Sequence, residues 1–101
     1  TDYADQQADA AHRAVAAVKV TTPTGATCRR AVLDLSARER ALYVALRAGL
    51  DSDADAWTAV ERFAVGSRAL KRWWRTQSER CVASAGAGDR AAVRRLLATV
   101  A

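Results

Sequence analysis

The side chains best suited to chemistry in this chain are hydrogen-bond donors in one aromatic and basic segment, residues 57–75. If Leu70, Trp73 and Trp74 face the interior of a helical domain, the opposite side of the same helix is polar. That side then presents hydroxyl, ammonium and guanidinium groups, from Ser67, Arg68, Lys71, Arg72 and Arg75. Because such donors bind phosphate oxygens and the edges of guanine bases in a major groove, the segment predicts a nucleic-acid partner.

Formal charge is unevenly distributed around this segment. The whole chain carries a net charge of +5 at pH 7. Residues 51–61 contain four acids and no base, whereas residues 62–101 contain nine bases and two acids. Arginine far outnumbers lysine, as is typical of a GC-rich genome, but such a bias acts everywhere and does not produce this polarity. The basic half therefore indicates an anionic partner: nucleic acid, a membrane surface or an acidic protein.

The two cysteines, Cys28 and Cys81, lie too far apart for a CxxC redox or zinc motif. A disulfide between them would close a loop of about 54 residues and stabilise the fold by roughly 4 kcal/mol in the chain-entropy model. That arrangement suits a small secreted helical protein. The alternative is a pair of reduced, buried thiols that pack as small apolar side chains. The sequence leaves both alternatives open.

Catalytic and metal-binding patterns are missing from the sequence. The spacing of Asp51, Asp53 and Asp55 superficially resembles a calcium loop. Such a loop needs glycine at its sixth position and a bidentate glutamate at its twelfth, and these positions hold Ala56 and Arg62. We therefore predict that the three aspartates cap helices, and that the protein is not an enzyme and has no metal site or cofactor.

The elements that must position these residues are helices. Apolar residues recur at helical spacing, and no stretch alternates as a β-strand does. Glycine and proline fall between the helical stretches and are interpreted as helix breakers, at Pro23, Gly25, Gly49, Gly66, Gly86 and Gly88. The sequence predicts an all-α fold for one domain over residues 1–101, a compact bundle of four to five short helices.

The first predicted helix runs over residues 2–20 and the second helical region over residues 28–48. Within the second region Ser36 and Glu39 have the spacing of a capping box, which predicts that a fresh helix begins at Ser36. Gly49 is the expected stop of that helix.

The acidic cap then leads into a helix over residues 57–64, and another is predicted over residues 67–84. The last helix is expected to begin after Asp89 as its N-cap. Its apolar positions are Val93, Leu96, Leu97 and Val100.

Residues 57–75, WTAVERFAVGSRALKRWWR, resemble the helix-turn-helix pattern of bacterial regulators and transposase-like DNA binders. The apolar positions that flank the turn and anchor the recognition helix are matched by Phe63, Val65, Leu70 and Trp73. Gly66 and Ser67 then take the places of the turn and the N-cap. The chain departs from the pattern at Ala64, where glycine is usual, and at Val60, where alanine is usual.

The resemblance covers at most residues 36–75 and implies DNA binding by a recognition helix over residues 67–75. A homodimer is then expected, since one short recognition helix seldom supplies enough specificity alone. The second hypothesis is a secreted helical bundle stapled by Cys28 and Cys81, which binds a protein, a hydrophobic ligand or an anionic membrane. The first hypothesis places the protein in the cytoplasm and the second outside it.

The three tryptophans are predicted to differ in burial. Trp57 is spaced to share a helix face with Val60 and Phe63, and it is therefore expected to be buried. Trp73 shares the face of the apolar residue three positions before it and is also expected to be buried. Trp74 is rotated by about 100° from Trp73 and is expected to be the more exposed of the pair.

Overall fold

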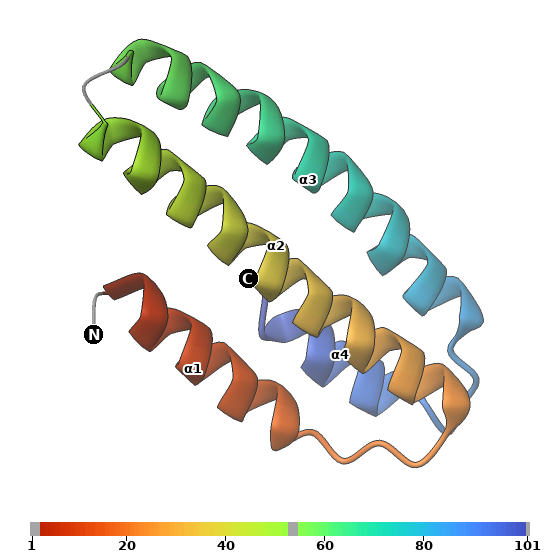
Figure 1. Cartoon of the computed structure of the whole chain (residues 1–101). Helices are drawn as coiled ribbons and strands as arrows, with labels where there is room; N and C mark the ends of the chain where they lie inside the picture. Colours follow the sequence, from red (N-terminus) through yellow and green to blue (C-terminus); the bar gives the residue numbers. More distant parts are fainter. Residues whose placement is uncertain (1–2, 53–54, 101) are drawn as a thin grey trace.

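The structure is a computed structural model, and it describes residues 3–52 and 55–100. This part of the chain contains four helices and no strand (Figure 1). The helices are α1 (Tyr3–Ala16), α2 (Pro23–Asp51), α3 (Ala56–Ser84) and α4 (Arg90–Ala98). The predicted all-α fold is confirmed.

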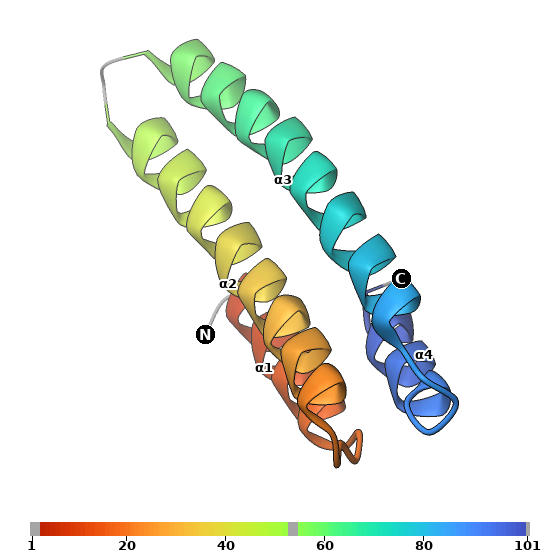
Figure 2. The same ribbon diagram turned by 90° about the vertical axis from the view of Figure 1, so that its right-hand side faces the viewer.

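Two long helices dominate the architecture. Helices α2 and α3 have 29 residues each and lie side by side as an antiparallel hairpin (Figures 1 and 2). The molecule measures 53 × 28 × 19 Å, and its radius of gyration of 15.7 Å exceeds the value of about 13 Å expected for a compact chain of this length. The predicted helical bundle is confirmed, and its four described helices agree with the predicted four to five. Two of these helices are long where short ones were predicted, and the bundle is less compact than expected.

Three of the glycines expected to break helices lie inside them: Gly25 in the first turn of α2, Gly49 near its end and Gly66 within α3. The last two lie where α2 and α3 pack together. A Cβ atom on Gly49 would lie 2.5 Å from Cβ of Ala59, and one on Gly66 would lie 2.5 Å from a methyl group of Leu42. Neither glycine has a positive φ. Glycine at these two positions lets α2 and α3 approach closely, so its role is packing and not the termination of a helix.

The start of α2 also differs from the prediction. Pro23 occupies the first turn of α2, where its missing amide hydrogen costs nothing, and Thr22 is the N-cap. The Thr22 hydroxyl accepts a hydrogen bond from the Gly25 amide over 3.0 Å. Ser36 lies inside the continuous helix, so the fresh helix predicted there does not exist. A run of alanine, leucine and arginine favours the helix throughout this region.

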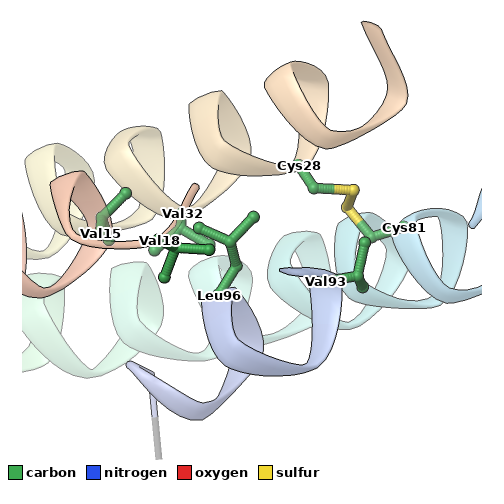
Figure 3. Close-up of a cluster of buried hydrophobic side chains, with 7 residues drawn as sticks. All are labelled: Val15, Val18, Cys28, Val32, Cys81, Val93 and Leu96. Carbon is green, nitrogen blue, oxygen red and sulfur yellow. A yellow bond between two sulfur atoms is a disulfide. The ribbon is translucent and has the colours of Figure 1, made fainter. Parts of the chain in front are cut away.

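The buried core lies at one end of the hairpin, where the chain enters α2 and leaves α3. Its residues are Val15, Val18, Cys28, Val32, Cys81, Val93 and Leu96 (Figure 3). Cys28 and Cys81 are joined by a disulfide, with Cα atoms 5.7 Å apart. The disulfide therefore takes the place of the reduced thiols that the sequence left as an alternative.

Polar contacts tie the shorter helices to this end. The Arg29 guanidinium donates to the Val18 carbonyl just after α1. Asp89 is the N-cap residue of α4, as predicted. Its carboxylate makes no cap hydrogen bond to α4 and instead accepts one from the Thr22 hydroxyl. These contacts fix the start of α2, the end of α1 and the start of α4 in one place.

The two ends of the hairpin are covered to different extents. Helix α1 packs along α2, and α4 packs against both α2 and α3. Because α4 has only nine residues, it packs beside the second half of α3 and does not reach the first half (Figure 2). Figure 2 shows the first half of α3 beside α2, with neither α1 nor α4 against it. Four helices therefore surround the disulfide end of the hairpin, and fewer surround the end near the α2–α3 turn.

Candidate interaction surface

Large apolar side chains are exposed mainly on the less covered end of the hairpin. Among the described residues these are Tyr43, Val44, Leu50, Trp57, Val60, Val65 and Val82. Six of the seven lie between residues 43 and 65, and Trp57 is 67% exposed. Scattered exposed apolar residues need no explanation, whereas a group on one side of the hairpin does. Helical spacing places Tyr43 and Leu50 on one side of α2 and Trp57 and Val60 on one side of α3, whereas Val44 lines a pocket with His12 and Val65 lies on another side of α3.

A groove runs between α2 and α3 and begins beside Val100, the last described residue after α4. It has a volume of about 290 Å³. Its apolar lining comes from Leu35, Leu42, Tyr43, Phe63, Leu70, Trp74 and Val100. Its polar lining consists of Glu39, Ser67 and Lys71. The groove therefore continues the channel between α2 and α3 in which α4 packs, and its lining is mostly apolar.

Heptad spacing extends this groove toward the turn. Leu50 follows Tyr43 by seven residues, and Val60 precedes Ser67 by seven. Residues seven apart share a face in helices that pack as a coiled coil. Trp57 likewise precedes Lys71 by two heptads. We call the groove together with Leu50, Trp57 and Val60 the open face.

Two aromatic rings cross the hairpin at the middle of the open face. The ring centroids of Tyr43 on α2 and Phe63 on α3 are 5.1 Å apart, and the planes are inclined by 49°. Tilted pairs of this kind are the favoured geometry of aromatic side chains. Phe63 is half-buried, but Tyr43 remains 52% exposed. The pair therefore joins α2 to α3 and still leaves aromatic surface in contact with solvent.

The charges near the open face have opposite signs at its two ends. Lys71 lines the groove near α4, whereas Asp51 lies exposed beside the α2–α3 turn. Asp55 also lies beside this turn, but it lines a separate pocket with Ala59 and Arg62. Glu39 also lines the groove, and partial burial raises the pKa of its carboxyl above the ordinary value.

Asp55 caps α3, as predicted. Its carboxylate accepts hydrogen bonds from the Trp57 amide over 3.1 Å and from the Thr58 hydroxyl over 2.6 Å. The hydrogen bond from Thr58 holds the pKa of the Asp55 carboxyl below its usual value. Asp51, expected to be a cap, is instead the last residue of α2. The third expected cap, Asp53, lies outside the described residues.

The five residues predicted to bind nucleic acid do not form one group. Ser67 and Lys71 line the groove between α2 and α3. Arg68, Arg72 and Arg75 are exposed, and their spacing of four and three residues places them on one side of α3. The turn predicted at residues 66–67 is not formed, because α3 continues through it from Ala56 to Ser84. The predicted donors are therefore divided between the groove and the outer side of a straight helix.

The predicted burial of Trp57 was wrong, because this residue is largely exposed. Trp57 shares a side of α3 with apolar neighbours, but no third helix among those described covers that end. Trp73 and Trp74 are both half-buried. Trp74, expected to be the more exposed, packs against the core cluster. The Arg38 guanidinium lies 4.1 Å above the ring of Trp73, which is a cation–π contact.

The residues that sequence reasoning missed are Glu39, Tyr43, Leu50 and Val60. These residues can be found from the seven-residue spacing on each helix. On α3, for example, this spacing leads from Cys81 through Trp74 to Val60. That spacing becomes informative only when both helices are known to be uninterrupted.

No helix in the described part of the chain has the length and apolar character needed to span a membrane. No protein-family model matches the chain, and no curated protein or solved structure shows a significant similarity to it.

Proposed function

We propose that this chain is a disulfide-stapled helical interaction module that binds a protein partner through the open face. The observation that carries the proposal is the concentration of exposed apolar side chains at one end of the hairpin, including Trp57, Val60 and Leu50. Large apolar side chains that are exposed together on one side of a protein are characteristic of binding surfaces. Aromatic residues such as Trp57 are also the residue types that dominate binding energy in protein interfaces.

The shape of the open face suits a helix. Helix α4 already occupies the same channel between α2 and α3 and places Val93 and Leu96 in the core. The groove continues that channel beyond Val100. A partner helix with apolar residues three and four positions apart would meet the same two helices in the same way. The proposed binding mode is therefore an amphipathic helix in a groove.

The disulfide supports a location outside the reducing cytoplasm. Cys28 and Cys81 are 2% and 5% exposed and form part of the core. Disulfides of this structural kind are typical of secreted proteins and are rare in the cytosol. Reaction of the unfolded, unreduced protein with a thiol reagent tests this step. No reactive thiols are expected, and two reactive thiols would contradict the proposed location.

Site-specific photo-cross-linking tests the open face. The photoreactive residue p-benzoylphenylalanine replaces Val60 in one variant and Val65 in a matched control, both expressed in cells that naturally make the protein. Both valines are exposed, by 40% and 58%, but heptad spacing places only Val60 on the open face. Irradiation should give a protein adduct from position 60 and little from position 65. Equal adducts at both positions, or none at position 60, would contradict the proposal.

A second candidate function is the binding of duplex DNA by the outer side of α3. Arg68, Arg72 and Arg75 support it because they are exposed on one side of an uninterrupted helix. Arginines arranged in this way bind phosphates, and affinity for DNA would fall steeply as salt rises. A fluorescence titration with a labelled duplex tests this function. The triple alanine variant should lose most of the affinity, and a wild-type chain without affinity at low salt would refute it.

A further inference from the structure

We infer that the partner of the open face is a second copy of this chain, packed antiparallel to the first. This inference rests on the proposed function, because it names the occupant of the same surface. Two copies related by a twofold axis would place the open half of one hairpin on the open half of the other. The result is an arrangement of four helices, two from each copy. In the monomer alone, α2 and α3 form a pair that no other described helix covers near the turn (Figure 2).

The first argument is continuity with an interface inside the monomer. At the disulfide end, α4 packs on α2 and α3 and closes the channel between them. At the other end the same channel is open, although its lining keeps the same heptad spacing from Trp74 through Ser67 to Val60. A helix pair from a second copy presents apolar residues at the same spacing. The second copy therefore extends the packing pattern that α4 begins.

The second argument concerns size. The open half of the hairpin is roughly 24 Å long, and two packed helices are about 20 Å wide. A face of these dimensions has a projected area of about 480 Å², which places the interface among the smaller specific ones, below the standard size of about 800 Å² per partner. A small ligand in the groove would leave Leu50 and Trp57 exposed, because neither lines it. A second copy of the hairpin is large enough to cover them.

The third argument concerns charge and fixes the relative direction of the two copies. Residues 51–61 carry four acids and no base, and Lys71 is the basic residue of the groove. A parallel pair would place the acidic turns of both copies together, which is unfavourable. An antiparallel pair centred near Ala64 places Asp51 of one copy near Lys71 of the other. Asp55 lines a separate pocket with Ala59 and Arg62 and takes no part in this pairing. The same arrangement places each exposed Trp57 against the groove of the second copy.

Sedimentation equilibrium of the purified, oxidised chain tests this inference. The wild-type protein should have twice the chain mass of 10.8 kDa at concentrations between about 1 and 100 µM. Val60→Glu, which places a charge in each half of the interface, should raise the dissociation constant at least 30-fold or so. The matched control Val65→Glu should leave the constant within about threefold. Circular dichroism should show an unchanged helix content in both variants.

Zero-length carbodiimide cross-linking tests the antiparallel arrangement. A mixture of unlabelled and ¹⁵N-labelled chains distinguishes cross-links between copies from those within one copy. We expect Lys71 of one copy to be joined to Asp51 of the other. Links between copies that join Lys71 only to other carboxylates would overturn this arrangement.

A chain that remains monomeric at 100 µM, or equal effects of Val60→Glu and Val65→Glu, would overturn the inference. The proposed function is judged separately by the photo-cross-linked adduct at position 60. An adduct whose mass differs from twice that of the chain would identify another protein on the same face. In that case the interaction module stands and the second copy is rejected.

Discussion

Gly49→Ala is the most direct test of the close packing between α2 and α3. In a free helix the change stabilises, because alanine favours the helix over glycine by about 1 kcal/mol. In this fold the new methyl carbon would lie 2.5 Å from Cβ of Ala59. A single methyl group has no rotamer with which to escape, so the backbones must separate. Overpacking of this kind costs about 1–3 kcal/mol.

The expected net effect of Gly49→Ala is a destabilisation of about 1 kcal/mol, which for a chain of this size lowers Tm by roughly 4–8 °C. Thermal unfolding followed by circular dichroism measures it. The exchanged variant Gly49→Ala/Ala59→Gly moves the methyl group from one helix to the other and should recover most of the lost Tm. Gly86→Ala is the control, because a Cβ atom there would meet nothing within 4 Å.

Gly66→Ala should be less harmful than Gly49→Ala. The new Cβ atom would meet the end of the Leu42 side chain, and that side chain can rotate. A Gly49→Ala variant with a higher Tm than the wild type would refute the packing role of this glycine. It would favour helix propensity alone as the dominant effect at this position.

Three further predictions concern charge, the disulfide and the tryptophans. Burial raises the pKa of Glu39, so the folded state favours the protonated carboxyl and stability is lost as pH rises through that pKa. Glu39→Gln should therefore raise Tm at pH 7 relative to the wild type, and the difference should vanish below about pH 4 in melts across this range. Replacing Cys28 and Cys81 together by alanine should cost about 4 kcal/mol in chemical unfolding, and a loss below about 1 kcal/mol would contradict the stapling role. Trp74→Ala should destabilise the monomer by about 2–4 kcal/mol and Trp57→Ala by much less, as urea unfolding would show, and the reverse order would contradict the observed packing.

The sequence predicted those features of the fold that depend on local physics. Helical periodicity and the lack of alternating segments were sufficient for the all-α class. Short polar side chains before apolar runs identified Asp55 and Asp89 as N-cap positions. The spacing of the last helix identified Val93 and Leu96 as buried. Each of these depends on neighbours close in the chain.

Features that depend on a distant partner were mispredicted. Gly49 and Gly66 look like breakers in isolation, and only the residues opposite them show that they are packing positions. The turn expected at residues 66–67 failed for the same reason. Trp57 has the spacing of a core residue, but its burial needs a third helix at that end. Periodicity identifies a face of a helix and does not reveal what covers it.

The disulfide also fixes the register of the α2–α3 pair. The seam of this hairpin repeats every seven residues and places a large side chain against a small one, as Leu42 lies against Gly66. A slip of one heptad would place Leu42 opposite Ala59, so the seam alone would tolerate the wrong alignment. Such a slip moves α3 by about 10 Å along α2, which no bond between Cys28 and Cys81 can span. The helices can separate near the turn and close again in only one alignment.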